Sequence, residues 1–252
     1  TNTQSAVKAR DLRSNSKQIL KLKKAYEAKY SNGFFATKRG EIIPADKDKQ
    51  YCIELSYLGK NLTAWYMQRP NLSYGETKIF DKYFNTLFKN DYLPEDAYAL
   101  SFWMRKIMDA WTQENPLGLE EELLTMKAYA PYHLLFAISM VFAKCNNQTN
   151  VPSPSECLKV ASENNLVDSI INIAANCLNS AISAEKNNCE QNNRSFIPQN
   201  WVKNKSCNAG IMSAIQNYFS FLPTMNKEMD SKLKNGVKID SKYFSYRVQA
   251  ED

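Results

Sequence analysis

Apolar residues recur at helical spacing along most of the chain. Between residues 17 and 30, one face holds the apolar positions Ile19, Leu22, Tyr26 and Tyr30. The opposite face holds the basic positions Lys17, Lys21 and Lys24. Because serine and asparagine suited to capping come just before it, this stretch is predicted to be an amphipathic helix with one apolar and one basic face.

A small amount of β-structure is predicted after this helix. Asn32-Gly33 is a turn signal, and in the following FFATKRGEII short aromatic and β-branched runs flank Lys38-Arg39-Gly40. This pattern predicts a β-hairpin near residues 33–44 with a basic tip. The charged stretch ADKDKQ at residues 45–50 is typical of a loop.

From about residue 50 the pattern is helical again. Prolines mark the end of one helix at Pro70 and the start of another at Pro94, and apolar positions at residues 79–87 indicate a helix between them. Further elements are predicted at about residues 119–129, 131–145, 166–182 and 211–222, with a polar loop from residue 185 and a short strand within 242–252. The predicted fold class is all-α, mainly helical, with a little β-structure near the front.

The predicted elements fall into three parts. Residues 1–50 form a basic front segment, a helix plus the hairpin, which is continuous with a helical core at 51–145. The polar stretch NNQTNVPSPSE separates this core from a second helical part at 155–252. This stretch is either a domain boundary or a loop between helix pairs of the same domain.

The basic excess lies entirely in the front segment. Residues 1–50 hold 12 Lys and Arg against 5 Asp and Glu, a net charge of +7, whereas residues 51–252 hold 20 against 21. A concentrated positive field of this kind favours an anionic partner such as nucleic acid. The alternative is a solvated surface whose charge serves only solubility.

The apolar runs, the cysteines and the single histidine argue against a membrane protein and against a metal-binding protein. The longest apolar run, at residues 134–143, is about half the length that a membrane-spanning helix needs, so it predicts a core helix and no membrane partner. The six cysteines are scattered without a C-x-x-C pair, and His133 is the single histidine. This pattern predicts reduced thiols in the cytoplasm, and neither a metal site nor a cofactor.

No catalytic motif stands out, so enzymatic activity stays open. Glu76-Thr77-Lys78 matches the E-x-K letters of one nuclease class, but it opens a predicted helix and has no acidic partner on a strand. His133 lies in an apolar helix, where a packed histidine is favoured over a general base. The seven glycines form no phosphate-binding loop.

The basic residues of the front segment are the strongest candidate site. Lysine and arginine neutralise phosphates, and amide side chains between them can bond phosphates or base edges. The predicted nucleic-acid contacts are Asn2, Gln4, Arg10, Arg13, Lys17, Lys21, Lys24, Lys38 and Arg39.

Short motifs follow one another in a distinctive order through roughly the first 110 residues. They are Thr1-Asn2-x-Gln4-x-x-Val7, Asp11-Leu12-Arg13-Ser14, Gln18, Phe34-Phe35, Lys38-Arg39-Gly40, Leu58-Gly59-Lys60, Ala64-Trp65, Gln68-x-Pro70-Asn71 and Ile79-Phe80. In order and spacing, this series resembles the AIPR family, the abortive-infection phage-resistance proteins of bacteria. Family members often carry Tyr-Glu-Arg before the basic pair, where this chain has Phe35-Ala36-Thr37.

The resemblance implies that residue 1 lies inside a longer bacterial antiviral protein with a nuclease-like region ahead of it. It implies a carboxy-terminal, non-catalytic helical portion that helps the parent protein engage nucleic acid through the basic front segment. The alternative is a module that self-associates into a homo-oligomer or senses a phage protein through the apolar helices from residue 50 onward. In both cases the rest of the parent protein is an expected partner.

Overall fold

Helices make up most of the structure. The computed structural model describes residues 2–109, 111–112 and 114–249, with side chains from residue 4 onward. Thirteen α-helices and two two-stranded sheets lie within these residues. The predicted mainly helical fold class is therefore confirmed.

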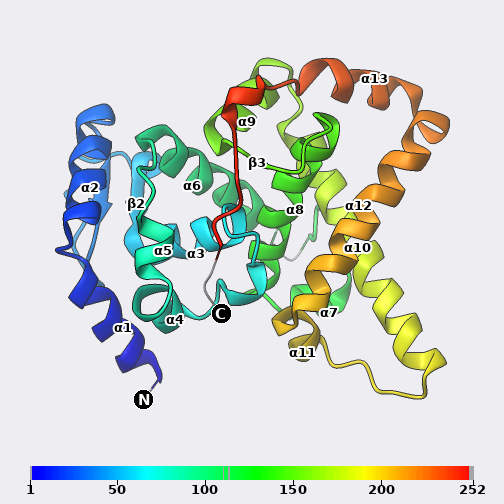
Figure 1. Ribbon diagram of the computed structural model, residues 1–252, viewed down its shortest axis with the longest axis horizontal. Coiled ribbons are helices and arrows are strands. Elements are labelled where there is room, and N and C mark those ends of the chain that lie inside the picture. The colour runs from blue at the N-terminus through cyan, green and yellow to red at the C-terminus, as the bar shows by residue number, and fades with distance from the viewer. Residues whose placement is uncertain (1, 110, 113, 250–252) are drawn as a thin grey trace.

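The helix α8 (Ala130–Cys145) lies at the centre of the fold (Figure 1). Thirteen of its residues are buried, because apolar side chains surround it on all sides. It packs against α3 (Leu55–Trp65), α6 (Pro94–Asp109), α10 (Val167–Gln191) and α12 (Lys205–Met225). The apolar run at residues 134–143 is thus part of a core helix, as predicted.

Shorter helices lie around this core. They are α4 (Glu76–Asp81), α5 (Phe84–Phe88), α7 (Glu121–Leu124), α9 (Pro154–Glu163), α11 (Pro198–Lys203) and α13 (Lys227–Gly236). Single turns of 3-10 helix occur at Lys49–Tyr51, Pro70–Leu72 and Ser241–Tyr243.

The strand β1 (Phe34–Ala36) pairs in parallel with β2 (Cys52–Glu54), so the predicted hairpin at residues 33–44 is wrong. Parallel strands cannot be joined by a tight turn, and residues 37–51 form the longer connection that they need. The Glu41 carboxylate accepts hydrogen bonds from the backbone N–H groups of Thr37 and Lys38, which turns the chain away from β1. The second sheet pairs β3 (Val151–Pro152) with β4 (Phe244–Ser245), which confirms the strand predicted within residues 242–252.

Several helix boundaries differ from the prediction. The stretch predicted as one helix at residues 79–87 is divided between α4 and α5, because the backbone leaves helical geometry at Tyr83. Residues 185–191, predicted as a loop, continue α10, where Cys189 is buried against the core. The helix α9 begins inside the polar stretch, since the Ser153 side chain accepts a hydrogen bond from the Glu156 N–H and caps it.

One hydrophobic core joins the parts predicted at 51–145 and 155–252. The polar stretch between them lies against this core. Trp65 Nε1 donates a hydrogen bond to the carbonyl oxygen of Pro152 at 2.7 Å, and Trp103 Nε1 donates one to that of Pro154 at 3.4 Å. The stretch therefore packs on the same core as the helices on either side of it, and it contains β3 and the first turn of α9.

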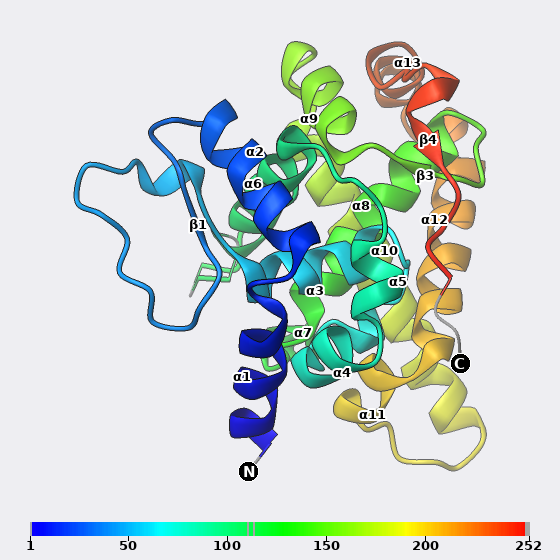
Figure 2. The same ribbon diagram turned by 60° about the vertical axis from the view of Figure 1, so that its left-hand side comes forward.

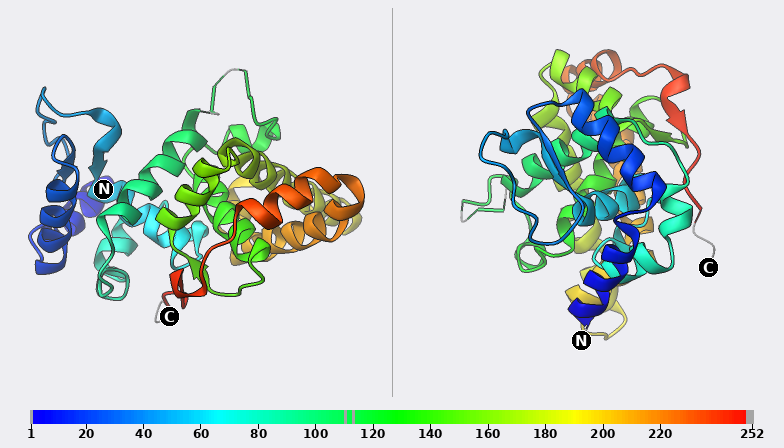
Figure 3. Two further views of the ribbon diagram at one scale, coloured as in Figure 1. Left: turned by 90° about the horizontal axis from the view of Figure 1, so that it is seen from above. Right: turned by 90° about the vertical axis from the view of Figure 1, so that its left-hand side faces the viewer.

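Residues 2–51 form an outer layer at one end of the molecule (Figures 2 and 3). This front layer consists of α1 (Asn2–Arg13), α2 (Lys17–Lys29), β1 and the loop at residues 37–51. The helix α1 packs mainly on α4, and α2 packs mainly on α6 and β1. The front layer is the part of the fold that carries the predicted site.

Candidate nucleic-acid interface

The helix α2 matches the sequence prediction. Ser16 caps it by accepting a hydrogen bond from the Ile19 N–H, and Ile19, Leu22 and Tyr26 are buried. The Tyr26 hydroxyl donates a hydrogen bond to the backbone carbonyl of Tyr51 at 2.8 Å, which ties α2 to the chain just before β2. Burial raises the pKa of this hydroxyl well above its ordinary value, so it remains a donor. The basic face of α2 consequently points away from the core.

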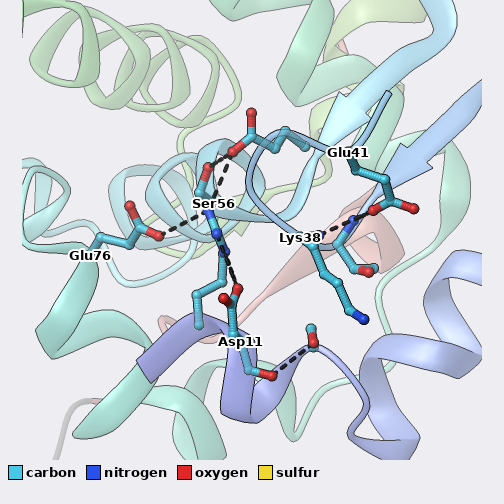
Figure 4. Close-up of polar contacts among 9 residues, drawn as sticks. Asp11, Lys38, Glu41, Ser56 and Glu76 are labelled. Atoms are coloured by element: carbon cyan, nitrogen blue, oxygen red, sulfur yellow. Dashed lines mark hydrogen bonds and ion pairs between the residues drawn. The ribbon is translucent and has the colours of Figure 1, made fainter. Parts of the chain in front are cut away.

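The most deeply buried side chain described in α1 is an arginine, and Ala9 is the residue of this helix that packs against the hydrophobic core. Arg10 is 2% exposed, and its guanidinium lies 3.1 Å from Asp11 and 3.6 Å from each of Glu54 and Glu76. The Ser56 hydroxyl donates a hydrogen bond to the same Glu54 carboxylate. In Figure 4, Glu76 lies to the left of Ser56 and Asp11 lies below it, and a dashed line leads from each toward the space between them. One arginine thus joins α1 to β2 and α4.

Carboxylates outside the front layer compensate much of its charge. Lys21 Nζ lies 2.9 Å from Asp91, and Lys29 Nζ lies 2.9 Å from Glu95. The hydrogen bond from Lys29 lowers the pKa of the Glu95 carboxyl, so that group is ionised when the pair forms. Together with Glu54 and Glu76, these carboxylates reduce the net charge at the front end from the +7 of residues 1–50 to +3.

Three of the predicted contacts are therefore engaged within the molecule. Arg10 is buried among carboxylates and offers no surface to a phosphate, which corrects its assignment as a nucleic-acid contact. The guanidinium of Arg13 lies over the Phe84 ring, 5.0 Å from its centroid, and is half-buried. Lys21 is exposed but paired with Asp91. The side chain of Asn2 lies outside the described residues.

The other predicted contacts lie on the surface. Among the residues that the structure describes, no carboxylate lies within 4.0 Å of the charged groups of Lys17, Lys24, Lys38 and Arg39, all exposed. Lys8 and Lys49 are also exposed and have no described carboxylate within that distance, although the sequence analysis did not include them among the predicted nucleic-acid contacts. Their membership of the same basic segment was the one signal that could have included them. Six exposed cations of the front layer are thus free to meet an anion.

An open groove of about 640 Å³ brings part of this set together. Gln4, Lys8 and Leu12 line it from one face of α1, and Arg39 lines it from the loop. An amide and two cations therefore face the same space, although Lys8 and Arg39 are 31 residues apart in the sequence, and the Asp11 carboxylate that also lines the groove is paired with Arg10. This arrangement fits a phosphate backbone, which is bound by cations and amides without reading of bases.

Outside the front layer, the two residues that the sequence offered as catalytic candidates, His133 and Glu76, are each bonded within the fold. His133 is buried, and its Nδ1 donates a hydrogen bond to the Tyr129 carbonyl oxygen at 3.0 Å. Burial lowers the pKa of this imidazole to about 4. Glu76 is engaged by Arg10. In the described part of the chain, no three His, Cys, Asp or Glu residues are grouped so that they could hold a metal ion.

Membrane insertion through a helix has no support in the described residues. None of the helices there is both long enough and apolar enough to cross a bilayer.

Comparisons with protein-family models, with curated proteins and with solved structures gave no significant match to this chain.

Proposed function

We propose that this chain is a helical portion of an abortive-infection phage-resistance protein and binds nucleic acid through its front layer. The observation that carries the proposal is a set of six exposed cations that have no carboxylate partner among the described residues: Lys8, Lys17, Lys24, Lys38, Arg39 and Lys49. The same layer bears part of the motif series that resembles the AIPR family, including Asp11-Leu12-Arg13-Ser14 and Lys38-Arg39-Gly40, while the rest of the series lies between residues 58 and 80. The phosphate backbone is the expected contact, because the cations are spread over a surface and most are flexible lysines.

The proposal has a specific electrostatic consequence. Each phosphate contact releases counterions, so the affinity for DNA or RNA falls steeply as salt rises. Charge reversal at Lys17 and Lys24 removes two cations from the outer face of α2 without touching its buried face. We expect Lys17→Glu/Lys24→Glu to lower affinity at least tenfold at low salt and to reduce the slope of log affinity against log salt by about 2.

Fluorescence anisotropy with labelled duplex and single-stranded oligonucleotides at 50 and 200 mM salt measures both quantities. The matched control is Lys159→Glu/Lys238→Glu, which makes the same change in net charge at exposed lysines of α9 and of the segment after α13. Equal losses in the two double variants would show that net charge alone is responsible and would reject the front layer as the binding surface.

A second candidate function is self-association through the groove between α10 and α12. Small side chains and Tyr218 line this groove, and Phe221 and Met225 beside it are 61% and 75% exposed. Exposed apolar side chains next to a groove are typical of protein contacts. Light scattering on the samples used for anisotropy separates the two proposals, because a tight oligomer without affinity for nucleic acid would favour assembly.

A further inference from the structure

A second groove lies between the front layer and the helical body. It has a volume of about 370 Å³, and two helix faces and a loop enclose it. Tyr57 and Asn61 line it from one face of α3, Met104 and Arg105 line it from α6, and the connection between β1 and β2 closes it. This volume is at the lower end of the range for small-molecule sites, so the groove can admit a single nucleotide and not a duplex.

The charges in this groove are unbalanced. Lys38, Lys49 and Arg105 line it, and Arg105 bonds only a neutral partner, the Ser101 hydroxyl, among the described residues. The Tyr98 ring also lies 5.9 Å from this guanidinium. Three cations therefore face the groove. Lys38 and Lys49 come from the loop between β1 and β2, and Arg105 comes from α6 of the helical body.

Two carboxylates also line the groove, but each is engaged elsewhere. The Glu41 carboxylate accepts the backbone hydrogen bonds of the loop and lies 3.9 Å from Lys23. The Glu54 carboxylate accepts from Ser56 and pairs with Arg10. Neither is paired with a cation of the groove, so the groove retains a positive field.

The wall of the groove contains an unsatisfied hydrogen-bond acceptor. Asn61 is 3% exposed, and its Oδ1 has no hydrogen-bond partner among the described residues. A buried amide oxygen without a donor is costly, and natural proteins retain few such groups. On α3, Tyr57 lies one turn before Asn61 on the same face, and its ring is 55% exposed. An aromatic surface and an acceptor thus line the same groove as the three cations.

We propose that this groove binds a nucleoside phosphate, in the form of an unpaired nucleotide of a single-stranded nucleic acid. The phosphate lies among Lys38, Lys49 and Arg105, the base stacks on Tyr57, and a base N–H donates a hydrogen bond to Asn61 Oδ1. Every base carries an N–H on its Watson–Crick edge, and that edge is free only in an unpaired strand. The inference rests on the proposed function and adds to it a preference for single strands.

The test compares normal and abasic single strands of equal length and charge. Asn61→Leu removes the acceptor and keeps the number and branching of the side chain's heavy atoms, and the loss of an unsatisfied buried oxygen offsets the cost of fitting the larger methyl groups. We expect this variant to bind the normal strand about five- to tenfold more weakly, and to bind the abasic strand and duplex as the wild type does. Tyr57→Ala, at an exposed position, should repeat the result by loss of stacking.

Arg105→Gln is the control for the two base-contact variants, because it removes a proposed phosphate contact instead. It should weaken normal and abasic strands to the same extent, because it removes a charge and not a base contact. If Asn61→Leu and Tyr57→Ala bind both strands as the wild type does, the inference is overturned while the proposed function stands. If the wild type binds no nucleic acid at all, the proposed function fails and this inference with it.

A competition arm distinguishes a strand from a free nucleotide. We expect 5′-mononucleotides to displace the labelled strand at least a hundredfold more weakly than an unlabelled strand, because they lack contacts with the neighbouring cations of the front layer. Equal displacement by mononucleotides would overturn the assignment to a strand.

Discussion

The front layer and the central helix differ in what holds them in place. In α8, thirteen residues are buried, and nearly all of them are apolar. In α1, the one buried side chain among those described is the charged Arg10. Apolar burial stabilises in proportion to area and tolerates some repacking, whereas a buried guanidinium depends on each of its partners.

Because of this difference, the interactions that set the stability of the whole molecule are not the ones that attach α1 to it. The body has a continuous apolar core, so its cooperative unfolding sets the stability of the molecule. The front layer keeps α2 on that core through Ile19, Leu22 and Tyr26, but α1 through ion pairs. Segments with few buried apolar contacts open locally at lower free energy than the core. We therefore expect substitutions in the two regions to differ in how much free energy of unfolding they cost and in how much of the molecule they affect.

The largest expected effect is a cavity in α8. Phe142 is fully buried and its ring meets that of Trp103 edge-on, with centroids 6.1 Å apart. Phe142→Ala should lower the free energy of unfolding by about 4 kcal/mol, because the transfer energy is lost and a cavity remains. Urea unfolding followed by tryptophan fluorescence and by circular dichroism should report one transition, shifted equally for both probes. A loss below about 1 kcal/mol would contradict the central position of α8.

The next effect should be confined to the front layer. Arg10→Met leaves Glu54 and Glu76 facing one another without a cation, at an expected cost of about 3 kcal/mol. Hydrogen exchange should show faster exchange in α1 while the amides of α8 keep their protection. Lys21→Ala is the control, since its exposed pair with Asp91 should contribute less than about 0.5 kcal/mol. Faster exchange throughout α8 would show that the two regions are not separable.

The smallest effect is a pH dependence of the body. His133 stays neutral in the folded protein because burial lowers its pKa to about 4, whereas the unfolded chain takes up the proton below about pH 6.5. Its contribution is present above that pH and is lost as pH falls toward 4. Between pH 7 and pH 5 we expect a loss of about 2 kcal/mol that is absent in His133→Gln. Identical pH profiles for wild type and variant in urea unfolding would refute it.

The sequence was informative where one helix face is apolar. The helices at Lys17–Lys29, Pro94–Asp109 and Ala130–Cys145 follow from spacing and proline punctuation. The helix α1 was not predicted, since its apolar residues form no continuous face. The parallel pairing of β1 and β2 was missed as well, because a local turn signal at Asn32-Gly33 says nothing about a strand that follows a long connection.

The surface position of the candidate contacts was predicted in part. Exposure of Lys17, Lys24, Lys38 and Arg39 agrees with their position on polar faces or loops. The burial of Arg10 could not be foreseen, because Glu54 and Glu76 reach it only in the folded chain. The net charge of +7 for residues 1–50 overstated the positive charge of the folded front layer for the same reason. A sum along the sequence omits the carboxylates that the fold brings next to these lysines and arginines.

The pairing of β1 with β2 has a consequence for how such a protein can diversify. The two strands fix both ends of the 37–51 connection side by side, and β2 leads directly into the core helix α3. Lengthening a surface loop whose ends are already held costs little free energy. Changes of length and residue type in this connection can therefore alter the walls of both grooves while every helix stays in register.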